Sequence, residues 1–327
     1  MSSFLLLSVG SRELGLGHLV RAGRLAQHIK NHTHHSVVEI ARADNMGNGL
    51  NLDSNRKDSK DIFSALLEDV KKFTYEEKFD FAVLDLPFDR IGIEFISLVK
   101  AARKIARYLV AIDRPLGFIN QFFWPPGEPV PPNVVFGWDR FITEPKNVTL
   151  LRQDSADLIV ATGGSDLHDL GEIWPGLIAG ALQAGQLVDW VSGPYARNPR
   201  IPENSEIKFR VLTGVTDIPK EALASQAQIA LCVYGVTFFE LLALGIPTVV
   251  YLPEGAALRG EAEQLAAAEV AVVARDPMEA IWKLGELDRS LALRSHLKKN
   301  MGLKIRGGEG PERFLSELSS RFSFDFC

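Results

Sequence analysis

Apolar runs and amphipathic stretches alternate along almost the whole chain. The apolar runs are continuous and rich in Val, Ile and Leu, which is typical of parallel strands covered on both faces. They predict strands at residues 4–8, 37–41, 81–86, 109–113, 134–136, 158–162, 188–191, 209–212, 229–234, 248–252 and 270–273. The amphipathic stretches predict helices at residues 19–30, 59–73, 91–107, 170–184, 238–244, 260–268 and 277–286. This alternation indicates an α/β fold in which a doubly wound parallel sheet forms twice.

A proline-rich segment separates the two halves of this pattern. Residues 122–133 read FFWPPGEPVPPN, and their prolines exclude a regular helix or a central strand. A new α/β pattern opens with DLIVATGG, so we place the domain boundary near residue 150. The expected domains are residues 1–149 and 150–327. The C-terminal stretch RGGEGPERFLSELSSRF predicts a glycine loop and a terminal helix that can pack back across the junction.

Composition narrows the class of protein. The chain of 327 residues has 46% apolar residues, 24% charged residues and a net charge of −5, so no overall positive field favours nucleic acid. Cys232 and Cys327 cannot form a disulfide framework, which fits a reducing cytoplasm. No apolar run is long enough for a membrane span, and the N-terminus lacks the basic flank of a signal peptide. We expect a cytoplasmic protein that is not integral to a membrane; the sequence leaves its oligomeric state open.

The first candidate ligand-binding turn follows the first strand and reads Gly15-Leu16-Gly17-His18. Glycines let the backbone approach a ligand, and a following helix directs free N–H groups at it. His18 at a helix start is disfavoured as a cation by the helix dipole and can accept a proton. A dinucleotide site would have a third glycine where Val20 stands, although Glu39 imitates its acidic ribose partner. A purely structural histidine is the alternative.

The second candidate turn, ATGGSD, ends the first strand of the second half. Loops after the carboxyl ends of parallel strands are where such sheets bind ligands, so Gly163, Gly164 and Ser165 are candidate phosphate-binding residues. The structural interpretation is that Ser165 or Asp166 caps the next helix, and the two interpretations are compatible.

The third candidate turn lies in CVYGVTFFELLALGIPTVVYLP, where a buried strand ends at Tyr234. Thr237 appears at the start of a helix with Glu240 three residues later, which is the spacing of a capping box. The functional interpretation places a phosphate on the N–H groups of Gly235, Val236 and Thr237. Glu240 would then bind a ribose diol, since one carboxylate can accept two hydroxyl hydrogen bonds.

Together these turns resemble the GT-B superfamily of nucleotide-sugar enzymes, and most closely the UDP-sugar hydrolases of pseudaminic acid biosynthesis and their spore-coat polysaccharide relatives. The matching residues, in chain order, are Gly15, Gly17, His18, Arg21, Asp85, Asp113, Gly163 to Asp166, Thr237, Glu240, Gly308, Gly310 and Arg313. The sequence departs from the family where Ala22, Leu86-Pro87 and Arg114 replace its cysteine, His-Tyr and second aspartate. These departures fall in the half expected to hold the sugar.

The resemblance implies two Rossmann-like domains with parallel sheets and a UDP-sugar in an interdomain cleft. It implies that His18 accepts the proton of the nucleophile and that Asp85 or Asp113 orients His18 or binds sugar hydroxyls, unless either aspartate only caps a turn. Helix N–H groups would stabilise the departing UDP without a metal or another cofactor. Gln264 stands where the family places residues near the phosphates or the sugar; a solvated helix face is the alternative.

Four functions remain open on the sequence. The first is a UDP-sugar hydrolase of surface-glycan or nonulosonic-acid biosynthesis, and the second is a GT-B glycosyltransferase that uses the same site with an acceptor hydroxyl. The third is a catalytically silent nucleotide-sugar-binding protein, because the N-terminal motifs are eroded. The fourth is an NAD enzyme built on the first glycine turn and Glu39.

Overall fold

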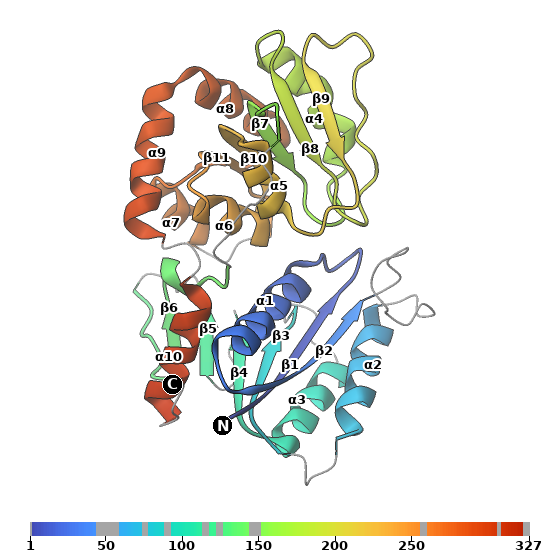
Figure 1. Cartoon of the computed structure of the whole chain (residues 1–327), viewed down its shortest axis with the longest axis vertical. Helices are drawn as coiled ribbons and strands as arrows, with labels where there is room; N and C mark the ends of the chain where they lie inside the picture. Colours follow the sequence, from blue (N-terminus) through green and yellow to red (C-terminus); the bar gives the residue numbers. More distant parts are fainter. Residues whose placement is uncertain are drawn as a thin grey trace. The chain divides into compact units, whose positions relative to one another are not determined.

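The structure of the chain is a computed structural model, and Figure 1 shows its elements. It describes residues 2–43, 59–73, 78–87, 93–112, 118–121, 127–143, 152–255, 260–305 and 309–322. The chain divides into two compact units. The first comprises Met1–Glu144 together with Glu309–Cys327, and the second comprises Pro145–Gly308.

The first unit is a six-stranded parallel sheet with helices on both faces. Its strands are β1 (Ser3–Gly10), β2 (Ser36–Ala43), β3 (Phe79–Asp85), β4 (Ala106–Ile112), β5 (Phe118–Gln121) and β6 (Val134–Phe136). Its helices are α1 (Gly17–His32), α2 (Ser59–Lys71), α3 (Ile93–Ile105), the short 3-10 helix Trp138–Arg140 and α10 (Gly310–Phe322). The strand order is β2-β1-β3-β4-β5-β6.

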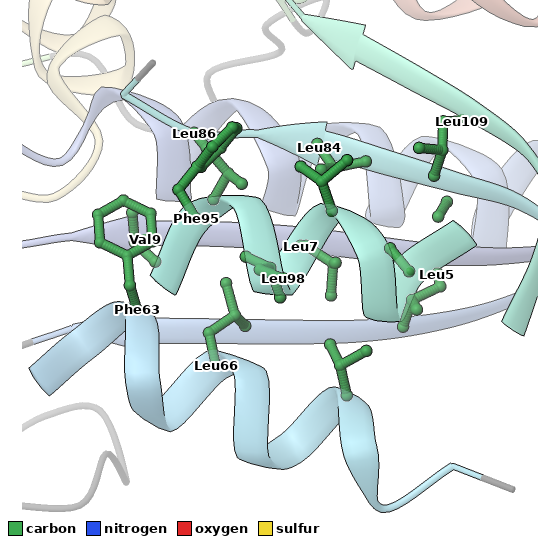
Figure 2. Close-up of a cluster of buried hydrophobic side chains, with 14 of the residues drawn as sticks. Leu5, Leu7, Val9, Phe63, Leu66, Leu84, Leu86, Phe95, Leu98 and Leu109 are labelled. Atoms are coloured by element: carbon green, nitrogen blue, oxygen red, sulfur yellow. The ribbon is translucent and has the colours of Figure 1, made fainter. Parts of the chain in front are cut away.

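Alternate side chains of β1 enter two different cores. Leu5, Leu7 and Val9 pack with residues of α2 and α3, and Figure 2 shows this cluster with Phe63 and Leu98. Because successive residues of a strand point to opposite faces, the intervening leucine and phenylalanine positions of β1 face the other way, toward α1 and α10. A strand buried on both faces needs apolar residues at every position, which is why β1 reads as a continuous apolar run.

The second unit repeats the architecture. Its strands are β7 (Leu158–Ala161), β8 (Leu187–Val191), β9 (Lys208–Leu212), β10 (Ile229–Val233), β11 (Thr248–Tyr251) and β12 (Val272–Ala274). Its helices are α4 (Leu170–Ala181), α5 (Ile218–Ser225), α6 (Val236–Ala243), α7 (Glu261–Ala268), α8 (Pro277–Arg289) and α9 (Leu291–Lys304). The strand order is β12-β11-β10-β7-β8-β9, and every pairing is parallel.

The last helix of the chain belongs to the first unit. Phe314, Leu315 and Leu318 of α10 are buried in the same core as Phe4 and Leu25. The approach is close at the start of the helix, because a Cβ added to Gly310 would lie 1.9 Å from the carbonyl oxygen of Phe141. Only glycine fits at that position.

The structure adds four elements that the sequence pattern does not predict. These are β5, α5, α9 and the short 3-10 helix Trp138–Arg140. The start of α5 carries ordinary signals, since Asp217 accepts a hydrogen bond from the backbone N–H of Lys220 and a proline follows in the first turn. None of the helices in the described part of the chain combines the length and apolar character that crossing a membrane requires.

Candidate functional site

Each sheet has one point at which the strand order reverses direction. In the first sheet this point lies between β1 and β3, and in the second it lies between β7 and β10. Loops that leave the carboxyl ends of neighbouring parallel strands diverge there, and open α/β sheets bind their ligands at such points. All three candidate turns leave one of these four strands.

His18 and Asp85 meet at the switch point of the first sheet. His18 is the second residue of α1, which follows β1, and Asp85 is the last residue of β3. Nδ1 of His18 lies 2.7 Å from Oδ1 of Asp85. Arg21, one turn further along α1, donates from Nε to Oδ2 at 2.7 Å and from Nη2 to Oδ1 at 2.6 Å. The carboxylate is therefore held by a bidentate arginine and one histidine.

Asp85 remains ionised although it is fully buried. Burial alone would raise the pKa of Asp85, but the charge of Arg21 and the hydrogen bonds from Arg21 and His18 outweigh burial and lower it. The ionised carboxylate of Asp85 can only accept a hydrogen bond, so Nδ1 of His18 is the donor. In the neutral ring the proton therefore lies on Nδ1, and Nε2 keeps its lone pair. The side chain of His18 is 23% exposed against 1% for Asp85, so the ring can reach a substrate while its orienting partner cannot.

The first turn does not have the geometry of a dinucleotide site. Ser11 and Gly15 form a small closed turn, with the N–H of Ser11 donating to the carbonyl of Gly15, before α1 begins at Gly17. Glu39, which the sequence places near the end of its strand, lies in the middle of β2, which runs on to Ala43. An acidic ribose partner belongs at the carboxyl end of that strand, so this part of the NAD interpretation is wrong.

The Gly163–Gly164 loop in the second unit is clamped by a neighbouring loop. A Cβ added to Gly193 would lie 2.5 Å from the Cα of Gly164 and 2.6 Å from the carbonyl oxygen of Gly163. The N–H of Tyr195 also donates to the carbonyl of Gly164. Backbone approaches backbone so closely that only glycine fits at position 193, and the loop is fixed in one shape.

Asp166 caps the helix that follows this loop. Its two carboxylate oxygens accept hydrogen bonds from the backbone N–H groups of Leu170 at 3.0 Å and Gly171 at 2.8 Å. Burial is the largest influence on Asp166 and raises its pKa, despite these hydrogen bonds. The N-cap position of α4 is occupied by Asp169, whose side chain makes no capping hydrogen bond. Of the two capping candidates in the sequence, Asp166 is the one whose side chain binds N–H groups of the first turn, and Ser165 is buried.

The β10–α6 turn differs in one respect from the sequence prediction. The N-cap of α6 is Gly235, with φ of 155°, and no side chain caps the helix. Thr237 is therefore the second residue of the helix rather than its cap, and the predicted capping box with Glu240 is wrong. Because Thr237 is already helical, Glu240 lies one turn deeper, on the buried side of α6, with 4% of its surface exposed. Val236 opens a helix with no acidic residue in its first turn.

Helix α7 is tied to the same turn. The hydroxyl of Tyr234 donates a hydrogen bond to Oε1 of Glu261, the first residue of α7. Gln264 lies one turn further along α7, and its Oε1 is buried without a hydrogen-bond partner among the described residues. A buried amide oxygen with no partner costs free energy unless a ligand or water satisfies it.

The structure thus collects the predicted residues into two groups. Gly17, His18 and Asp85 lie in the first unit; Gly163, Gly164 and Ser165 lie beside Tyr234, Gly235, Val236, Thr237 and Glu240 in the second, because β7 and β10 are neighbours. Asp113 lies outside the described residues. Glu261 is an addition to the predicted site residues, and Arg21, which the sequence indicates only as part of the matching motif, gains a role as the partner of Asp85. The spacing His-x-x-Arg on one helix face is a signal for Arg21, whereas nothing local connects Glu261 to Tyr234. Among the described residues no cluster of metal-ligating side chains occurs.

These features define the class of the fold. Two six-stranded parallel sheets, each with a loop cluster at its switch point, form the GT-B architecture that the sequence predicts. No protein-family model matches the chain, and no curated protein matches it.

Solved structures do match, over nearly the whole chain. CalG4, the calicheamicin glycosyltransferase, matches with a TM-score of 0.62 and 15% identity, covering 99% of this chain and 98% of its own. The glycosyltransferase VinC in complex with dTDP gives 0.55 and 13%, with 97% and 98% covered. The S. aureus MnaA–UDP structure gives 0.60 and 11%, with 99% and 97% covered. At such identities the likeness establishes the fold, and it gives no support to the pseudaminic acid hydrolase family in particular.

Proposed function

We propose that the protein is an enzyme that transfers a sugar from a nucleotide-sugar donor, with UDP as the nucleotide, to an acceptor hydroxyl. Of the three structures named above, CalG4 and VinC are glycosyltransferases, and the MnaA and VinC structures contain a nucleoside diphosphate. The observation that carries the proposal is the hydrogen bond between His18 and Asp85. It supplies a proton acceptor at Nε2 of the partly exposed ring and fixes the orientation of that ring.

The proposed step is a single displacement at the anomeric carbon. The acceptor oxygen attacks that carbon while its proton passes to Nε2 of His18, and the bond from the anomeric carbon to the diphosphate oxygen breaks. The bonding electrons leave with UDP. Because the nucleophile attacks from the side opposite the leaving group, the product has the inverted anomeric configuration.

We assign the nucleotide to the second unit. The first-turn N–H groups of α6, at Gly235, Val236 and Thr237, would stabilise the charge that develops on the leaving diphosphate. Glu240 would accept hydrogen bonds from the ribose hydroxyls. Gln264 supports this assignment, because the buried oxygen that it leaves unpaired needs a donor such as a sugar hydroxyl.

Hydrolysis of the UDP-sugar is the second candidate. The run of motifs from Gly15 to Arg313 resembles that of the UDP-sugar hydrolases, and water can replace the acceptor hydroxyl at the same base. A silent nucleotide-sugar-binding protein would keep the UDP site without turnover.

One experiment separates these functions. Purified protein is incubated with a panel of UDP-sugars, and UDP release is measured with and without candidate acceptors. We expect release that depends on an acceptor. Release at the same rate without an acceptor would identify a hydrolase. Tight UDP binding with equal, near-zero rates for the wild type and His18→Ala would identify a binding protein. Protection against thermal unfolding by NAD and not by UDP would overturn the proposal.

A further inference from the structure

Helix α9 is held to the second unit by a small part of its surface. Of its fourteen residues, only Leu297 and Met301 are buried. Two polar side chains add to this attachment: Nε2 of His296 lies 2.9 Å from Oε2 of Glu269, and the amide of Asn300 donates to the carbonyl of Glu269 at 3.1 Å. Figure 1 shows α9 along one side of the second unit. Most of the helix surface therefore faces solvent.

The charge of α9 is opposite to that of the whole chain. The helix reads LALRSHLKKNMGLK, so it contains four cations and no acidic residue, in a chain of net charge −5. Lys298, Lys299 and Lys304 are exposed. No carboxylate in the described part of the chain forms an ion pair with these lysines or with Arg294. The helix therefore presents a concentrated positive charge.

Two leucines share this exposed surface with the lysines. Leu291 is 69% exposed and Leu303 is 75% exposed, at opposite ends of the helix. At a rise of about 1.5 Å per residue, the two leucines lie about 18 Å apart along the axis, with Lys298 and Lys299 between them. The fold leaves most of the surface of both leucines in water, so a partner that covered this face of α9 would gain the burial of two aliphatic side chains.

We infer that α9 is a docking surface for an anionic lipid bilayer, on which the helix lies parallel to the membrane plane. Lysines interspersed with leucines on one helix face match a surface that has negative headgroups above acyl chains. Each cation near such a surface is attracted to it, and the leucines insert at the boundary between headgroups and chains. The protein would thereby bind reversibly to a membrane without crossing it.

The same charge could attract nucleic acid, but the residue types favour lipid. Single-stranded nucleic acid is bound by cations together with aromatic side chains on which bases stack. The exposed face of α9 offers leucines in that place, and the helix contains no aromatic residue other than His296, which is paired with Glu269. Leucine contributes to binding of acyl chains and contributes nothing to stacking.

Co-sedimentation of the full chain with lipid vesicles tests the inference. One set of vesicles contains phosphatidylcholine with phosphatidylglycerol, and the other contains phosphatidylcholine alone. We expect binding to the anionic vesicles that weakens as salt is raised, and little binding to the neutral ones. Lys298→Glu/Lys299→Glu should weaken binding about tenfold or more. Lys208→Glu/Lys220→Glu, which changes the net charge equally at exposed positions of the same unit, should bind like the wild type.

A third variant, Leu291→Ser/Leu303→Ser, keeps the charge and removes the apolar contacts. It should bind anionic vesicles several-fold more weakly, and its thermal unfolding should match the wild type because both positions are exposed. Failure of the wild type to bind anionic vesicles would overturn the inference, and so would equal losses in the two lysine variants. If the serine variant bound as tightly as the wild type and polyuridylate displaced the vesicles, α9 would be a nucleic-acid surface instead.

Discussion

Ser8 on β1 and Asp85 on β3 are register partners across two neighbouring strands. β3 ends at this pair, β1 ends two residues later at Gly10, and the helix that follows β1 passes beside the last residue of β3. This is why His18 and Asp85, which are 67 residues apart in the chain, come within hydrogen-bond distance. The pairing depends on strand register, so a shift of β1 against β3 would separate base and carboxylate.

Replacing His18 tests the proposed base. We expect His18→Ala to lower kcat/KM for the active donor about 10²- to 10⁴-fold, which is the range for loss of a general base. UDP release and thermal unfolding are measured together, and the melting temperature should change little because the ring is partly exposed. His296→Ala, at an exposed histidine of the other unit, is the control. Equal rates in His18→Ala and the wild type would exclude His18 as the base.

Replacing Asp85 should change stability as well as rate. Asp85→Asn leaves Arg21 buried without its counter-charge, and loss of one partner of a buried ion pair costs about 3–5 kcal/mol. Urea unfolding at neutral pH measures this loss. Asp154→Asn, at an exposed position, should leave stability unchanged. A loss no larger than that of the control would show that Asp85 is not a structural charge.

The ion pair of Asp85 and Arg21 also makes the stability of the folded protein depend on pH. The pKa of Asp85 is lower in the folded protein than in the unfolded chain, so the unfolded chain binds the proton more readily at acid pH. Its stabilising effect is complete above the unfolded value of about 3.9 and is lost as pH falls through the lower, folded pKa. Stability of the wild type should therefore fall more steeply below about pH 4 than that of Asp85→Asn. Parallel curves would contradict the lowered pKa.

Replacing Asp166 should destabilise the protein, because its side chain binds the N–H groups at the start of α4. Asp166→Ala removes both hydrogen bonds to the start of α4 and should cost about 1 kcal/mol, whereas Asp166→Asn keeps an accepting oxygen. Because burial raises the pKa of Asp166, its charged form is disfavoured in the folded protein, so the wild type should lose stability relative to Asp166→Asn as pH rises from the unfolded value of about 3.9 to the higher folded pKa, with no further change above it. Unfolding measured across pH checks both, with Ser165→Ala as the control. If Ser165→Ala cost as much as Asp166→Ala, the cap would be wrongly assigned.

Replacing Gly193 tests whether its close approach fixes the Gly163–Gly164 loop. Gly193→Ala forces a Cβ into backbone atoms that cannot rotate away, so we expect a loss of about 1–3 kcal/mol in stability and weaker UDP binding. Calorimetric titration of UDP and thermal unfolding measure the two effects. Gly180→Ala, on the exposed face of α4 with no atom within 4 Å of the added Cβ, should leave UDP binding unchanged. Unchanged UDP affinity in Gly193→Ala would separate this loop from the nucleotide.

Much of the fold follows from local pattern, and the exceptions have local causes. β1 and β10 are apolar at nearly every position because both faces are covered, which is a strong signal in a single sequence. β5 has only four residues with a polar end, and α9 buries only two residues, so neither produces a period that stands out. Helix α5 begins with the capping signals of Asp217 and a proline. Its apolar stripe is short, so the hydrophobic pattern alone does not predict a helix there.

The site is predictable only where one segment contains it. His18 and Arg21 are neighbours on one helix, and the glycine turns can be recognised from their composition. The link from Tyr234 to Glu261 depends on how α7 packs beside β10, which no local spacing reveals. The capping box predicted at Thr237 is wrong because α6 begins one residue before Thr237: Gly235 is the N-cap and Val236 is the first helical residue.

The placement of α10 has a consequence for biosynthesis. Residues near the end of the chain complete the hydrophobic core beneath β1, so the unit that is translated first cannot finish folding until the last helix has left the ribosome. Every strand and helix of the second unit is synthesised before that moment. A chain cut before residue 309 should therefore keep the whole second unit and lack part of the core of the first.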